Sequence, residues 1–177
     1  MNISIKTERL ILRDVREQDI PGLYELDADS AVHQYLGKRP IMSIEEAVET
    51  YHYIKGQYKA HGIGRWAVIE RASDSFVGWC GLKYERQVRE DMDYYDLGYR
   101  LRKPFWNKGF ATEAAAASLK YGFQTMKLRE IYAGAHAENI GSNKVLQKVG
   151  LRFIEPFEYD HMPHNWYGVT KSEWEKE

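Results

Sequence analysis

Residues 106–114, Trp-Asn-Lys-Gly-Phe-Ala-Thr-Glu-Ala, are the stretch that decides the fold. They join an extended segment, residues 94–102, to an alanine-rich helical run. Because the first N–H groups of a helix have no partner inside it and the dipole is positive there, an anion can bind at this end. Gly109 lets such a ligand approach the backbone closely. The junction therefore predicts a phosphate site, although an ordinary strand-to-helix turn has the same pattern.

Outward from this junction, apolar periodicity and turn residues divide the chain into strands and helices. Ser43 and Glu46 form a capping-box pattern at one helix start, and Gly150 stands where a helix should end. The order of elements predicts a mixed α/β fold, with a central sheet of about seven strands flanked by helices, in a single domain over residues 1–177. The expected strands are 8–15, 65–70, 76–86, 94–102, 130–137, 151–159 and 166–170, and the expected helices are 17–28, 44–60, 110–124 and 139–149.

The composition is that of an ordinary globular protein, with 44% hydrophobic and 29% charged residues in a chain of 177. The formal net charge of −1 argues against direct binding of nucleic acid. The single cysteine, Cys80, excludes an internal disulfide, and its apolar surroundings favour a buried, inert thiol. We find no long apolar run and no signal-peptide pattern, so we expect no membrane span and a cytoplasmic location. His161 and His164 lack further ligands at suitable spacing, so we expect no metal.

A second strand-to-helix junction, at residues 137–142, resembles the first in its layout. Asn139 is a good N-cap by residue type, and Ser142 follows it in the first turn. Both helices begin at the carboxyl end of the sheet, where open α/β folds usually bind ligands. Two such openings side by side favour one extended ligand that spans both, whereas a capping role alone would also explain Asn139.

The two junctions, taken with the order of elements, resemble the GNAT N-acetyltransferases. The second one reads Asn-Ile-Gly-Ser-Asn-Lys-Val-Leu-Gln-Lys-Val-Gly-Leu over residues 139–151. Within that family the chain looks like the RimJ/RimL-type branch, which includes ribosomal-protein N-terminal acetyltransferases. Residues 7–13 and 167–174 are also typical of the branch, so the resemblance covers essentially the whole chain. It implies an acyltransferase that uses acetyl-CoA as cosubstrate, and it leaves a homodimer open.

The resemblance also implies where acetyl-CoA would bind. The pyrophosphate would sit on the loop at residues 107–111, where Gly109 and Ala111 match the family's pattern. Asn107 stands where relatives often carry glycine, but asparagine tolerates the left-handed conformation. The pantetheine arm would follow the strand edge at residues 99–101, and Lys144 would face the adenosine phosphates or solvent. The implied cofactor-binding residues are Tyr99, Arg100, Leu101, Asn107, Lys108, Gly109, Phe110, Ala111, Thr112, Asn139, Ser142 and Lys144.

Acetyl transfer to an amine needs a proton acceptor for the amine and benefits from a donor to the departing thiolate. We expect Asp96 to be the base, because many relatives carry glutamate at this place, two residues before Gly98. Aspartate is shorter by one methylene, which predicts a bridging water. Leu146 occupies the position of the family's usual tyrosine acid. Ser142 matches a serine of the RimL-like branch and is the expected catalytic donor, unless it only holds the pantetheine.

The identity of the acceptor is left open by these residues. The leading hypothesis is a protein N-terminal α-amine, and the alternative is a small amine such as a polyamine, an amino acid or an antibiotic. The acidic residues Glu155, Glu158 and Asp160 would favour a cationic acceptor. A non-catalytic acyl-CoA-binding module is a further alternative, because the chain departs from the family's pattern at both catalytic positions. A nucleotide hydrolase is disfavoured, since no Lys-Ser or Lys-Thr follows a glycine-rich loop.

Overall fold

A computed structural model describes residues 3–86 and 88–176 of the chain. The sequence does not tell whether the charged segment 87–91 closes over the site. Its first residue, at position 87, lies outside the described residues. Within the described residues, eight strands form one sheet in the order β1-β2-β3-β4-β5-β6-β8-β7. The strands are β1 (Ser4–Lys6), β2 (Leu10–Arg13), β3 (Arg65–Glu70), β4 (Phe76–Glu85), β5 (Tyr94–Leu101), β6 (Glu130–His136), β7 (Arg152–Tyr159) and β8 (Met162–Thr170).

The helices connect these strands and cover the two faces of the sheet. The α-helices are α1 (Ile20–Asp27), α2 (Ile44–His61), α3 (Phe110–Lys120), α4 (Ile140–Lys148) and α5 (Lys171–Trp174). Shorter turns are the 3₁₀ segments η1 (Glu17–Asp19), η2 (Val32–Tyr35) and η3 (Lys103–Phe105), and the π-helical segment η4 (Tyr121–Thr125) that prolongs α3. Across the described ranges, none of the helices has the length and apolar character needed to cross a membrane.

The predicted fold class is confirmed, with one strand more than the seven expected. The added strand is β1, which has three residues and is too short for a periodicity signal, and the first predicted strand shrinks to β2. The short helix α5 was also missed; its N-cap, Thr170, accepts a hydrogen bond from the Glu173 N–H. The predicted capping box at Ser43 is present, and Gly62 ends α2 in the left-handed conformation.

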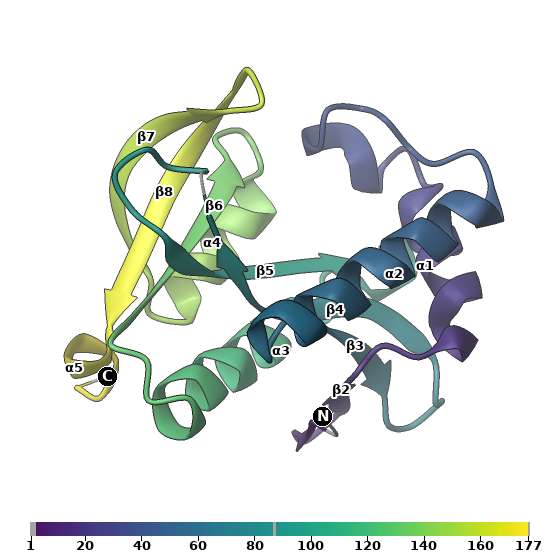
Figure 1. Ribbon diagram of the computed structural model, residues 1–177, viewed down its shortest axis with the longest axis horizontal. Helices are drawn as coiled ribbons and strands as arrows, with labels where there is room; N and C mark the ends of the chain where they lie inside the picture. The colour runs from purple at the N-terminus through teal and green to yellow at the C-terminus, as the bar shows by residue number, and fades with distance from the viewer. Residues whose placement is uncertain (1–2, 87, 177) are drawn as a thin grey trace.

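The sheet opens between β5 and β6. These strands are parallel, and their register is limited to Asp96 opposite Tyr132. On its other side β5 pairs with β4 over eight consecutive positions. Beyond Asp96 the edge of β5 that faces β6 is therefore free of strand partners among the described residues. Figure 1 shows the consequence, because β6, β8 and β7 fan away from the strands that lie beneath α2.

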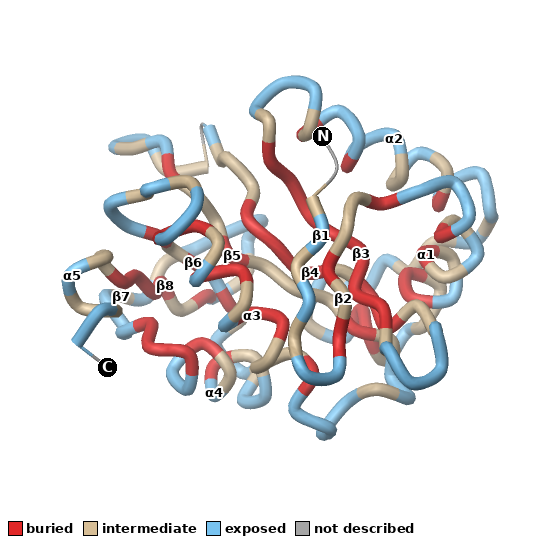
Figure 2. The backbone as a smooth tube through the Cα atoms, turned by 90° about the horizontal axis from the view of Figure 1, so that it is seen from below, coloured by how far each residue is buried: buried red, intermediate tan, exposed pale blue. Residues whose placement is uncertain are grey.

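Alternation along the strands sends side chains into two separate cores. One core gathers Ala67 and Ile69 of β3 with α1 and α2. The other gathers Trp66 and Val68 of the same strand with α3, α4 and the inward side chains of β6 and β8. In Figure 2 the central strands are buried along most of their length, while the outer turns of the helices are exposed. The helices α3 and α4 thus begin on one face of the sheet, on either side of the opening.

Candidate active site

The first junction, between β5 and α3, is shaped by two left-handed residues. Asn107 has φ +59° and Gly109 has φ +80°, so the expectation that asparagine tolerates this conformation is confirmed. Helix α3 begins directly after Gly109, and Glu113 N–H is bonded to Gly109 O at 3.0 Å. Within the described chain, no acceptor is bonded to the N–H groups of Phe110, Ala111 and Thr112. The geometry is that of an anion site.

Arg9, in the turn between β1 and β2, holds this junction in place. Its Nη1 donates to Lys108 O at 2.8 Å, and its Nε donates to Glu113 Oε2 at 2.7 Å. Its guanidinium also lies 4.7 Å from the centre of the Phe110 ring. Burial raises the pKa of Glu113, but hydrogen bonds from Thr7 and Arg9 more than offset this, so the pKa is lower than usual. Arg9 and Glu113 both lie in stretches that carry the resemblance, yet no sequence pattern indicates that they form a pair.

The second junction, between β6 and α4, is held by side chains. Asn139 Oδ1 accepts a hydrogen bond from Ser142 N–H at 3.0 Å, which confirms Asn139 as the N-cap. Leu146, on the following turn, is 1% exposed and packs in the core beside α3. The side chain at the position of the usual tyrosine acid therefore makes a core contact.

Asn143 was not predicted, and it is the hub of this junction. The residue is 9% exposed. Its amide nitrogen donates to His136 O at 3.0 Å and to Asn139 O at 2.7 Å. Its amide oxygen accepts from Asn165 Nδ2 at 2.8 Å and from the Tyr167 hydroxyl at 2.7 Å. One side chain thus ties the end of β6 and the start of α4 to β8.

Tyr99 crosses the opening between the two junctions. Its hydroxyl donates to Ser142 O at 3.0 Å and lies 2.9 Å from Ser142 Oγ. Burial raises the pKa of Tyr99 well above that of a free phenol. The structure thus brings together Tyr99 and Ser142, which the sequence assigned separately to the cosubstrate.

Asp96 lies on the opposite face of β5 and is held by a buried arginine that the sequence did not reveal. Arg65 is 8% exposed and forms an ion pair with Asp96 Oδ2. Its Nη1 also donates to the main-chain oxygens of Gly81 and Asp96, at 2.6 and 2.7 Å. A Cβ on Gly98 would meet Arg65 Nη2 at 2.5 Å, so the glycine makes room for the guanidinium. Among the described residues Asp96 Oδ1 accepts no hydrogen bond.

The remaining predicted residues divide between the two faces. The Arg100 side chain forms a 2.6 Å ion pair with the buried Asp27, so only its backbone lies at the strand edge. Leu101 is buried in the core, whereas Lys144 is exposed on α4. Two residues that were assigned by resemblance, Arg100 and Leu101, therefore direct their side chains away from the open strand edge.

Aromatic and histidine rings, together with the tip of the β7–β8 hairpin, lie over the face of the sheet that carries Asp96. The Tyr35 ring lies 5.2 Å from that of His136, which lies 5.6 Å from that of His164. Burial lowers the pKa of His164. At the tip between β7 and β8, Asp160 Oδ2 lies 4.0 Å from where a Cβ on Gly37 would be. The segment between α1 and α2 therefore comes close to the hairpin above this face.

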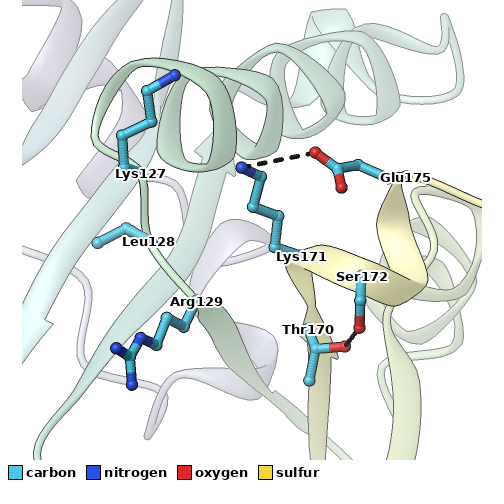
Figure 3. Close-up of a pocket in the computed structure, with 7 residues that line it drawn as sticks. All are labelled: Lys127, Leu128, Arg129, Thr170, Lys171, Ser172 and Glu175. Atoms are coloured by element: carbon cyan, nitrogen blue, oxygen red, sulfur yellow. Dashed lines mark hydrogen bonds and ion pairs between the residues drawn. The ribbon is translucent and has the colours of Figure 1, made fainter.

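Two cavities on the surface are lined by residues other than the predicted catalytic and cofactor-binding ones. A cavity of about 420 Å³, drawn in Figure 3, is lined by Lys127, Leu128, Arg129, Thr170, Lys171, Ser172 and Glu175. Another, of about 400 Å³, is lined by Ala137, Pro156, Phe157, Glu158, His161, Pro163, His164 and Asn165. The second cavity includes His164 of the ring cluster and Glu158, one of the acidic residues expected to favour a cationic acceptor. Over residues 3–86 and 88–176, no group of three His, Cys, Asp or Glu side chains is arranged as a metal site.

Comparisons with known proteins agree on one family. A family model described as an acetyltransferase (GNAT) domain matches residues 9–152. The chain is 30% identical to the uncharacterized N-acetyltransferase YnaD of Bacillus subtilis (strain 168), over 96% of this chain and 98% of that one.

Two solved structures share the fold at 17% identity. One is RimL, a ribosomal L7/L12 α-N-protein acetyltransferase, with a TM-score of 0.78 over 96% of this chain and 95% of RimL. The other is spermidine N-acetyltransferase from Vibrio cholerae in complex with CoA and spermine, with a TM-score of 0.77 over 95% of this chain and 99% of that one. Their acceptors differ although their folds are alike.

Proposed function

The chain belongs to the GNAT acetyltransferases, which use acetyl-CoA, and from this premise we propose that it acetylates the α-amine at a protein N-terminus. The chain is an N-acetyltransferase by family; the acceptor and the site residues are our proposal. We also propose that residues 1–177 act as one catalytic domain of the RimJ/RimL type.

The observation that carries the proposed site is the opening between β5 and β6, with a helix N-terminus on each side. The free N–H groups of Phe110, Ala111 and Thr112 suit the pyrophosphate of acetyl-CoA. The unpaired edge of β5 after Asp96 offers backbone groups to the pantetheine arm. Asn139 and Ser142 would meet the arm at its thioester end.

The proposed chemistry uses the two faces of β5 for different tasks. The amine nitrogen bonds to the acetyl carbon, and the bond from that carbon to sulfur breaks. An ammonium acceptor loses one proton before attack and another as the amide forms; one reaches the departing sulfur, and the other goes to solvent. Asp96 Oδ1 would accept a proton from the amine through water, and the Ser142 hydroxyl would donate to the sulfur.

The charges near the hairpin favour an acceptor with a single amine over a polyamine. Glu155 forms a 2.8 Å ion pair with Arg89, and Glu158 lies 3.6 Å from His161 at an exposed position. One of the three acidic side chains near the hairpin, Glu155, is therefore already balanced by an arginine. This observation supports an N-terminal α-amine, which carries one charge.

The acceptor is tested by measuring thiol release from acetyl-CoA with two sets of acceptors side by side. One set contains short peptides with free Ala, Ser or Met N-termini, and the other contains polyamines, amino acids and aminoglycosides. We expect turnover with the peptides. Turnover with small amines alone would refute the proposed acceptor, and acetyl-CoA binding without any turnover would favour a non-catalytic module.

The site is tested with two variants and a control. Asp96→Asn and Ser142→Ala should each lower kcat about 100-fold while acetyl-CoA still binds, the range usual for loss of acid–base catalysis. Asp93→Asn, an exposed carboxylate just before β5, should leave kcat unchanged. If Asp96→Asn turns over like the wild type, the base assignment is wrong.

A further inference from the structure

The Tyr99 side chain contacts Ser142. The proposed binding of the pantetheine arm uses the β5 backbone and does not explain this contact. The Tyr99 hydroxyl reaches the first turn of α4, where it lies 2.9 Å from Ser142 Oγ and 3.0 Å from Ser142 O. We propose that Tyr99 is a positioning residue, which holds the Ser142 hydroxyl so that its hydrogen points at the CoA sulfur. The inference rests on the proposed role of Ser142.

The hydrogen of the Tyr99 phenol has two acceptors within reach, and the choice decides where the serine hydrogen goes. If the phenol donates to Ser142 O, the serine must donate to the phenol oxygen. If the phenol donates to Ser142 Oγ, the serine hydrogen is released toward the opening. Carbonyls in the first turn of an α-helix already accept a bond from the N–H four residues on, so Ser142 O does not need Tyr99. A thiolate in the opening favours the second arrangement, because it is a strong acceptor.

The surrounding residues keep the Tyr99 and Ser142 hydroxyls in place for the second arrangement. Burial raises the pKa of Tyr99, so the phenol stays protonated and remains a donor throughout the neutral range. Asn139 fixes the main chain of Ser142 through its cap bond. Leu146 provides no hydroxyl at the position of the family's usual acid, so the pair of Tyr99 and Ser142 would supply the donor.

The chain offers a closely matched control for Tyr99. Tyr167 also places a hydroxyl on the first turns of α4, but it donates to Asn143 Oδ1 at 2.7 Å. Tyr99→Phe and Tyr167→Phe each delete one phenol oxygen, and the two oxygens contact adjacent residues of α4. A purely structural role of Tyr99 would make the two variants behave alike.

The test compares the affinity of the protein for CoA and for the CoA analogue that lacks sulfur, by calorimetry, across the pKa of the free thiol. The wild type should prefer CoA increasingly as pH rises, because the thiolate accepts the Ser142 hydrogen. In Ser142→Ala the ratio of the two affinities should fall by about tenfold or more, as expected for loss of a hydrogen bond to a charge. Tyr99→Phe should lose the preference to a similar extent, and the double variant no further. Tyr167→Phe and Ser142→Thr should keep it.

Each outcome separates this inference from the function on which it rests. If Ser142→Ala loses the preference but Tyr99→Phe keeps it, Ser142 acts alone and the inference is refuted. The inference also fails if the losses in Tyr99→Phe and Ser142→Ala add up, or if Tyr167→Phe loses as much as Tyr99→Phe. If Ser142→Ala keeps the preference, the proposed donor itself is wrong, and absence of CoA binding would refute the proposed site. Thermal unfolding of each variant confirms that it is folded.

Discussion

The two strand-to-helix junctions look alike in sequence but are built in different ways. The junction before α3 is made by backbone conformation, with Asn107 and Gly109 both left-handed and exposed. The junction before α4 is made by side chains, with Asn143 buried and bonded on both sides of its amide. The first keeps N–H groups free for a ligand, whereas the second fixes the place of Ser142. The same kind of substitution should therefore have opposite effects at the two places.

Removal of the Asn143 amide should have the largest effect. Asn143→Ala removes one of the two hydrogen bonds that each of two main-chain carbonyls accepts. It also leaves the Tyr167 hydroxyl and Asn165 Nδ2 without their acceptor, and each such loss is unfavourable. We expect the free energy of unfolding to fall by about 3 kcal/mol. Urea unfolding measures this change. Lys144→Ala, exposed and adjacent, should shift it by no more than about 0.5 kcal/mol. A small effect of Asn143→Ala would show that water replaces its bonds.

The exchange of glycine for alanine should have opposite signs at the two junctions. At Gly109, with φ +80°, a Cβ is strained and would lie 3.3 Å from Arg9 Nη2. Gly109→Ala should therefore cost about 1–2 kcal/mol of stability. At Gly141, on the first turn of α4, a Cβ meets only ordinary contact at 3.7 Å. Gly141→Ala should stabilise the protein by up to about 1 kcal/mol.

Binding of acetyl-CoA should also be affected by Gly109→Ala. Because Gly109 borders the free N–H groups, Gly109→Ala should also weaken acetyl-CoA binding by about tenfold or more, as expected for loss of at least one charged hydrogen bond. Calorimetric titration with acetyl-CoA checks this. Equal affinity of wild type and Gly109→Ala would mean that the pyrophosphate does not bind at this junction.

The difference between the junctions also explains what the sequence could predict. Gly109 acts through its own backbone conformation and Asn139 through a cap bond to a residue three positions on, so residue type and spacing were enough to find them. Arg9, Arg65 and Asn143 act on residues that the fold brings together, such as Arg9 with Glu113. Arg65 is the first residue of β3 and is followed by four apolar residues, and no local rule says which carboxylate it will meet. Element types were predictable for the same local reason, whereas the three residues of β1 are recognisable as a strand by their pairing with β2.

Asn107 allows a smaller test of the backbone-built junction. Its left-handed conformation is tolerated by asparagine but is less strained in glycine. Asn107→Gly should therefore change stability by less than about 1 kcal/mol, since relief of strain is offset by greater freedom of the unfolded chain. Urea unfolding measures the change. A large loss would instead show that the Asn107 side chain holds the loop.

Acid should loosen the two junctions at different pH values. Burial lowers the pKa of His164, so the folded state disfavours its protonation, and stability present above the ordinary value of 6.5 is lost as pH falls through it. His164 is the cross-strand partner of His136, whose carbonyl is bonded to Asn143. At the first junction the pKa of Glu113 lies below its ordinary value of 4.5, so its stabilising contribution persists until the pH falls below that.

At about pH 5.5, between these two values, only the side-chain-built junction should be weakened. Amide exchange should then quicken at Ser142 N–H, which is bonded to Asn139, but not at Glu113 N–H, which is bonded to Gly109. His164→Gln should reduce the change at Ser142, because it removes the buried group whose protonation the folded state disfavours. If both amides quicken together, acid opens the molecule as a whole, and the two junctions are not independent.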